Sequence, residues 1–115
     1  MVAMPLVVSD TSPIRALAHV QCVEWLEKLF SQVIIPPAVA HELANPPSGL
    51  YAVDLSRWQF MSIVTPKAGK RIAELRVSLD LGEAEAIALA EELGANAILI
   101  DEMAGRAAAV TSGLT

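Results

Sequence analysis

The stretch Leu81–Glu102, LGEAEAIALAEELGANAILIDE, decides the fold of this 115-residue chain. Its first half is rich in Ala, Leu and Glu, which favours a helix over Glu83–Leu93. Gly94 follows, and glycine readily takes the left-handed conformation that ends a helix. The apolar run Ala97–Ile100 then predicts a buried strand, because strands of a parallel sheet are apolar on both faces. The stretch therefore predicts a helix followed by a strand of an α/β sheet.

Two acids in this stretch are candidates for a functional site. Glu83 falls on the apolar side of the predicted helix, whereas Glu85 and Glu92 fall on the opposite side, where we expect solvent. The alternative for Glu83 is a first-turn acid that favours the helix dipole. Asp101 ends the predicted strand, and α/β proteins place ligand sites at the carboxyl ends of their strands.

Length and composition indicate a single domain over residues 1–115, long enough to bury roughly two thirds of its unfolded surface. Hydrophobic residues make up 54% of the chain and the mean hydropathy is +0.49, but no apolar run reaches the roughly 18 residues of a membrane helix. The amino terminus lacks the pattern of a signal peptide, and the single cysteine, Cys22, fits a reducing compartment. We therefore expect a cytoplasmic protein with no membrane segment, which associates with itself through apolar surface.

The formal net charge of −5 and the pI near 4.9 argue against a protein that tracks a nucleic-acid backbone with high affinity. A cluster of carboxylates around a metal ion would itself make the charge acidic. The charge therefore leaves a metal-dependent enzyme open.

The remaining patterns predict further strands alternating with helices. Strands are expected over residues 6–8, 33–35 and, at an edge, 60–64. Helices are expected over 13–19, 23–30, 38–44, 67–77 and 103–111, and a short helix is one interpretation of 50–58. This order implies a mainly parallel, four-stranded sheet covered by helices on both faces.

Two further acids lie near strand ends. Asp10 follows the first strand, and we expect Ser12 to cap the next helix with Pro13 at its first position. Glu42 lies at the edge of the apolar side of the helix after the second strand, while His41 should face solvent. The carboxyl ends of parallel strands meet at one edge of a sheet, so the acids are expected to converge there.

Converging acids would raise one another's pKa unless a cation neutralised them. The four candidates are Asp10, Glu42, Glu83 and Asp101. They include no His or Cys, and an all-oxygen ligand set suits Mg²⁺ or Mn²⁺. Such a cation polarises a phosphoryl oxygen and activates a water for attack on a phosphodiester.

The chain resembles the PIN-domain ribonucleases, and within them the branch that looks like VapC-type toxins. The resemblance rests on VVSDTSPIRALA (7–18), VIIPPAVAHEL (33–43) and LDLGEAEAIALAEELGANAILIDEMAGR (79–106), which together span nearly the whole chain. It implies a three-layer α/β/α sandwich and metal-dependent cleavage of RNA. It also implies that the four acids bind the metal and are catalytic, that Thr11 and Ser12 support Asp10, and that Glu102 is second choice to Asp101.

Members of that family usually continue into a fifth strand and further helices, whereas this chain stops at Thr115. We therefore expect four strands, a missing fifth strand and a C-terminally truncated domain, whose exposed edge favours association with itself or a partner. Arg15 and Arg106 are candidates for binding RNA phosphate, with surface or ion-pair roles as the alternative.

The leading hypothesis is a Mg²⁺- or Mn²⁺-dependent endoribonuclease, the toxin of a pair whose antitoxin protein is a partner. The alternative is a catalytically silent, PIN-like module that binds protein. A phosphotransferase with Asp10 as nucleophile is less well supported, because Ser12 stands where haloacid-dehalogenase-like sites carry a second aspartate. A dinucleotide-binding fold is poorly supported too, because no G-x-G-x-x-G follows the first strand.

Overall fold

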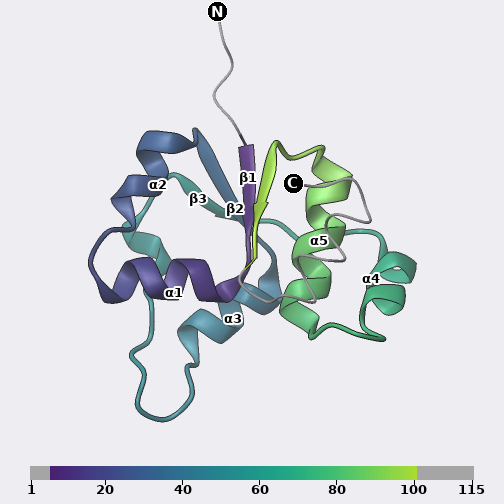
Figure 1. Cartoon of the computed structure of the whole chain (residues 1–115), viewed down its shortest axis with the longest axis horizontal. Coiled ribbons are helices and arrows are strands. Elements are labelled where there is room, and N and C mark those ends of the chain that lie inside the picture. The colour runs from purple at the N-terminus through teal and green to yellow at the C-terminus, as the bar shows by residue number, and fades with distance from the viewer. Residues whose placement is uncertain (1–5, 101–115) are drawn as a thin grey trace, which may run out of the picture.

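A parallel β-sheet forms the centre of the computed structural model, which describes residues 6–100 (Figure 1). Its strands are β1 (Leu6–Ser9), β2 (Gln32–Ile35), β3 (Met61–Ile63) and β4 (Ala97–Leu99). They lie in the order β3-β2-β1-β4, and every neighbouring pair is parallel. The four-stranded parallel sheet is thus confirmed, with β3 at an edge of the described sheet as predicted.

Helices connect these strands within the described residues. They are α1 (Thr11–His19), α2 (Glu24–Leu29), α3 (Pro37–Ala44), α4 (Gly69–Leu75) and α5 (Leu81–Leu93), with a 3-10 turn η1 (Leu55–Arg57) before β3. The helix predicted over 103–111 lies outside the described residues, and of the short helix considered over 50–58 the structure contains only η1. None of these helices is long and apolar enough to cross a membrane.

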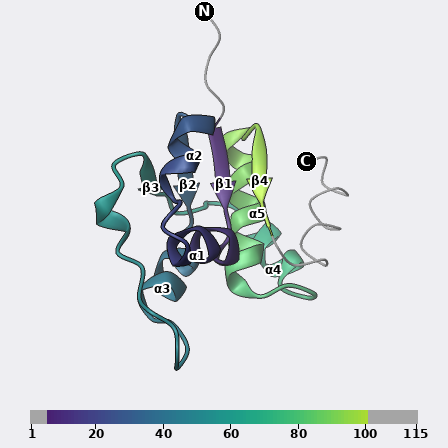
Figure 2. The same cartoon turned by 60° about the vertical axis from the view of Figure 1, so that its left-hand side comes forward.

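Helices cover both faces of the sheet, which gives the expected three layers (Figures 1 and 2). Alternate strand residues point to opposite faces, so Val7 and Val33 pack on one face while Val8 and Ile34 pack on the other. The first face contacts buried residues of α1, α2 and α3, namely Ile14, Leu26, Val39 and Leu43. The second contacts α5 through Ala86, Leu89 and Ala90, and α4 packs on the far side of α5.

The start of α1 differs from the prediction. The helix begins at Thr11 and its N-cap is Asp10, so Ser12 is not the cap and Pro13 is the third helical residue. Proline fits there because the amide groups of a first helical turn have no partner within the helix. Asp10 therefore lies directly at the junction of β1 and α1.

The two ends of α5 follow the local sequence. Asp80 and Glu83 form a capping box: the Glu83 amide donates to Asp80 Oδ1 at 2.8 Å, and the Asp80 amide donates to Glu83 Oε1 at 3.3 Å. Gly94 ends the helix in the left-handed conformation, with φ of 61°, as its position predicted. The first turn of α5 lies at the edge of the sheet where β1 and β2 end (Figure 1).

Candidate functional site

Asp10 is a buried acid at the carboxyl end of an interior strand. Its side chain is 5% exposed, and its backbone amide donates to the Leu99 carbonyl of the neighbouring strand β4 at 2.9 Å. The adjacent Ser9 is fully buried, and its hydroxyl donates to the Asp10 carbonyl at 2.9 Å. The neighbouring strand thus holds the Asp10 amide, and the Ser9 side chain holds its carbonyl.

Glu42 approaches from α3, on the first face of the sheet. Its Oε2 accepts a 2.6 Å hydrogen bond from the Thr11 hydroxyl at the start of α1. Hydrogen bonds from a hydroxyl to a carboxylate are short and stronger than those between neutral groups. Thr11 therefore orients Glu42, whereas the sequence suggested that it supports Asp10.

Asp10 and Glu42 meet at Gly82, the second residue of α5. A Cβ atom at this position would lie 3.0 Å from Glu42 Oε1 and 3.4 Å from Asp10 Oδ1. Glycine is therefore the residue at position 82 that lets both carboxylates keep their positions. Gly82 was not among the predicted site residues, because a close approach between distant segments leaves no periodic signal in a sequence.

Glu83 completes a group of three acids at this edge. It is 5% exposed, and its Oε2 is buried with no hydrogen-bond partner among residues 6–100. The pKa of Glu83 is raised to about 7, chiefly by burial and in smaller part by the nearby carboxylates of Asp80 and Asp10, while the hydrogen bond from the Asp80 backbone lowers it. An inward-facing acid is what the helical periodicity predicted at this position.

The other predicted acids lie outside the described residues. Asp101 and Glu102 follow Ile100, the last residue described, and β4 pairs with β1 through Leu99 and Ser9. Within residues 6–100, no group of three or more His, Cys, Asp or Glu side chains is arranged to hold a metal ion. The three described acids therefore share an edge of the sheet without forming a closed ligand shell.

The remaining predicted residues have different surroundings. The Arg15 guanidinium donates to the Glu42 carbonyl at 2.8 Å and to the Tyr51 carbonyl at 3.4 Å, so it ties α1 to α3 and to the following loop. Ser12 is half-buried and lines an open pocket of about 270 Å³ between α1 and the end of β4. Arg106 lies outside the described residues.

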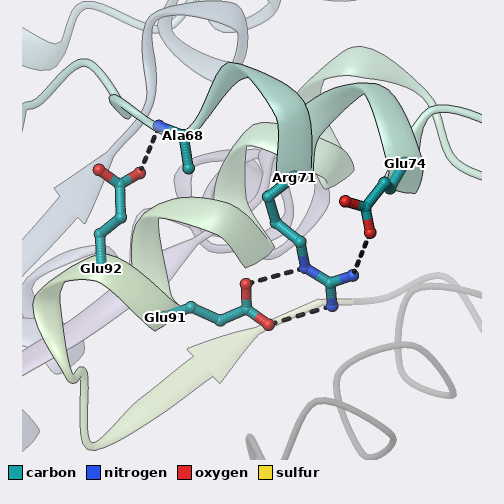
Figure 3. A network of polar contacts seen from close by, with 5 residues as sticks. All are labelled: Ala68, Arg71, Glu74, Glu91 and Glu92. Carbon is teal, nitrogen blue, oxygen red and sulfur yellow. Dashed lines mark hydrogen bonds and ion pairs between the residues drawn. The ribbon is translucent and has the colours of Figure 1, made fainter.

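The acids on the other side of α5 accept hydrogen bonds from backbone amides of neighbouring segments, and only Glu92 is as exposed as expected. Glu85 is half-buried and accepts from the Ala38 amide at 3.0 Å. Glu92 is exposed, as predicted, but it accepts from the Lys67 amide at 2.8 Å. It also accepts from the Ala68 amide at 3.4 Å (Figure 3).

The range 67–77, predicted as a helix, contains the basic residues Lys67, Lys70, Arg71 and Arg76, and α5 partly neutralises their charge. Arg71 forms two hydrogen bonds with Glu91, at 3.0 and 3.1 Å, and an ion pair with Glu74 at 3.7 Å (Figure 3). These bonds raise the pKa of Arg71. The arrangement agrees with a solvated, ion-paired helix face.

Comparison with known protein families identifies the family of this chain. A family model described as the PIN domain matches residues 6–115, which is nearly the whole chain. No curated protein and no solved structure matches the chain.

Proposed function

The chain belongs to the PIN-domain family, and from that premise we propose that it is a Mg²⁺- or Mn²⁺-dependent endoribonuclease that hydrolyses RNA phosphodiesters. PIN domains are generally nucleases, and they typically use divalent metals. The observation that carries the proposal is the meeting of the Asp10 and Glu42 carboxylates at Gly82, directly before the buried Glu83.

The chemistry of these acids fits a hard divalent cation. All their donor atoms are oxygens, which Mg²⁺ and Mn²⁺ prefer. Glu83 Oε2 is buried without a hydrogen-bond partner in the described part of the chain, as expected of an atom that a cation would contact. We assign Asp10, Glu42 and Glu83 as ligands, with Asp101 as the fourth and Glu102 as its substitute. The bound cation would polarise a phosphoryl oxygen and lower the pKa of a water molecule.

Neighbouring residues orient these acids and provide hydrogen-bond donors for a substrate. Thr11 holds Glu42 in one orientation through its 2.6 Å hydrogen bond. A pKa of about 7 lets Glu83 hold a proton near neutral pH, which reduces its repulsion of Asp10. Arg15 uses two of its N–H groups on carbonyls, and a guanidinium has five, so it keeps donors for an RNA phosphate. Arg106 is the second candidate for this role.

The proposed biological role is that of a cytoplasmic toxin controlled by an antitoxin protein. The similarity of the three sequence blocks to VapC-type toxins supports this role. Exposed apolar side chains on and before α2 support self-association, namely Val20, Trp25 and Leu29. A small upstream reading frame that encodes a DNA-binding antitoxin is the expected observation, and its absence beside the gene would contradict this role.

The second candidate is a catalytically silent protein-binding module. It is favoured by one observation, the lack of a three-residue metal-binding group within residues 6–100. Metal binding separates the two candidates, since the silent module needs no cation.

The test combines Mn²⁺ calorimetry with cleavage of single-stranded and structured RNA. We expect the parent to bind Mn²⁺ and to cut RNA, and Asp10→Asn to reduce cleavage at least about a hundredfold, because it removes a ligand charge. Glu27→Gln is the matched control: it removes one negative charge from an exposed position on α2 and should leave both measurements unchanged. A parent without Mn²⁺ binding, or cleavage that survives Asp10→Asn, would exclude the nuclease.

A further inference from the structure

Helix α3, which carries Glu42, has no capping side chain of its own. Its N-cap residue is Pro36, which has no polar side chain, and its first turn contains no acid. The acceptor is supplied by α5 instead, where Glu85 Oε1 accepts the Ala38 amide hydrogen at 3.0 Å. A carboxylate at a helix N-terminus satisfies an amide that has no partner within the helix and interacts favourably with the helix dipole.

We propose that Glu85 is a positioning residue that sets the approach of α3 to the first turn of α5 and thereby places the Glu42 carboxylate against Gly82 and Asp10. The inference rests on the proposed function in one respect, namely that these carboxylates bind a divalent cation. Glu85 itself is not assigned as a ligand, since its described contact is with the α3 backbone.

Helix geometry connects the two contacts. Ala38 and Glu42 are four residues apart on α3, which is about one turn, and Gly82 and Glu85 are three apart on α5. The hydrogen bond and the close approach thus involve adjacent turns of the same two helices. Because a helical turn is stiff, a change at the first contact displaces the second.

The other contacts of Glu42 come from α1. Thr11 holds its carboxylate, and Arg15 holds its carbonyl. These bonds fix α3 relative to α1, on one face of the sheet, whereas Glu85 reaches α3 from the helix that covers the other face. Without Glu85, Glu42 would keep its place beside Thr11 but lose its placement against α5.

The same helix provides a matched control. Seven residues after Glu85, Glu92 accepts from the Lys67 and Ala68 amides directly before α4, whose N-cap Ala68 also lacks a polar side chain. Figure 3 shows its bond with Ala68. Glu85 therefore caps the start of α3, whereas Glu92 binds the two residues that lead into α4. None of the predicted metal ligands lies on α4, so loss of the Glu92 contact should leave the positions of these ligands unchanged.

The experiment compares Glu85→Ala, Glu85→Gln and Glu92→Ala with the parent in Mn²⁺ calorimetry. We expect Glu85→Ala to weaken Mn²⁺ binding by roughly threefold to tenfold, at or below the usual effect of residues that orient metal ligands. Glu85→Gln should stay within about twofold of the parent, because an amide oxygen can accept the same hydrogen bond. Glu92→Ala should bind Mn²⁺ like the parent, although its Tm should fall about as far as the Tm of Glu85→Ala.

A second readout does not depend on the metal. In the metal-free protein, the amide NMR signals of Glu42 and Gly82 should shift in Glu85→Ala and stay in place in the other two variants. Unchanged signals in Glu85→Ala would overturn the proposal, as would equal losses of Mn²⁺ affinity in Glu85→Ala and Glu92→Ala. A parent that binds no Mn²⁺ would contradict the proposed function instead, and the NMR shifts alone would then decide the role of Glu85.

Discussion

Glu83 is the residue in which local structure and site chemistry conflict. Its Oε1 serves the capping box, which stabilises the start of α5, while its Oε2 is buried with no hydrogen-bond partner in the described chain. An unsatisfied buried acceptor costs about 1–3 kcal/mol, and more when it is charged. The raised pKa expresses this cost, because the protein favours the neutral carboxyl group.

Glu83 should therefore make the stability of the metal-free protein depend on pH. Its pKa rises from 4.5 to about 7 on folding, so between these values the folded chain holds a proton that the unfolded chain has lost. The stabilising contribution is complete below about pH 4.5 and is lost as the pH rises through 7. Glu83→Gln stays neutral at all pH values and keeps an acceptor for the Asp80 amide. The free energy of unfolding of Glu83→Gln minus that of the parent should therefore be larger at pH 8 than at pH 4.5 by on the order of 3 kcal/mol.

Urea unfolding in EDTA at pH 4.5 and pH 8 measures this difference. Glu27→Gln is again the control, because it makes the same substitution at an exposed position on α2, away from the site. If the difference between Glu83→Gln and the parent is the same at both pH values, Glu83 is not the group whose protonation changes on folding.

At the scale of elements, the first turn of α5 contacts the rest of the site through Gly82. In an exposed helix, Gly→Ala stabilises a protein by up to about 1 kcal/mol. At Gly82 the new methyl group would stand 3.0 Å from Glu42 Oε1 and displace that carboxylate. We expect Gly82→Ala to gain no stability and to weaken Mn²⁺ binding at least about fivefold, as changes beside metal ligands commonly do.

Gly69→Ala is the control for this substitution. Gly69 is the first residue of α4, and a Cβ atom there meets nothing within 4 Å among the described residues. It should therefore gain stability and bind Mn²⁺ like the parent. Calorimetry and urea unfolding check both variants, and equal Mn²⁺ affinities would show that Glu42 adapts without cost to binding.

The difference between Glu83 and Gly82 shows what the sequence could reveal at this scale. Glu83 was predictable because an acid on the apolar side of a helix disturbs a regular pattern, and Asp10 because it follows an apolar strand. Gly82 and Glu85 were not, because their roles depend on which segment lies opposite. A helical wheel correctly separates Glu85 from Glu83, but it cannot show that the amide of another helix occupies that side.

At the scale of the whole molecule, the site joins the two helical layers across the edge of the central sheet. Asp10 leaves the central sheet, Glu42 comes from α3 on one face, and Glu83 comes from α5 on the other. The alternation of strands and helices was enough to predict this sandwich, since a parallel sheet must be covered on both faces. The strand order β3-β2-β1-β4 was not predicted, because alternation leaves the arrangement of the strands open.

A cation bound between the two helical layers should stabilise the whole domain. A ligand that binds only the folded state adds about 2.7 kcal/mol at a hundred times its Kd. For a domain of this size, that corresponds to a Tm increase of roughly 10 °C. We therefore expect saturating Mn²⁺ at pH 8 to raise the Tm of the parent and of Glu27→Gln by this amount and to leave Asp10→Asn unchanged. If Mn²⁺ stabilises Asp10→Asn as much as the parent, the cation binds elsewhere, because a site that joins the layers at Asp10 cannot lose this ligand charge without losing stabilisation.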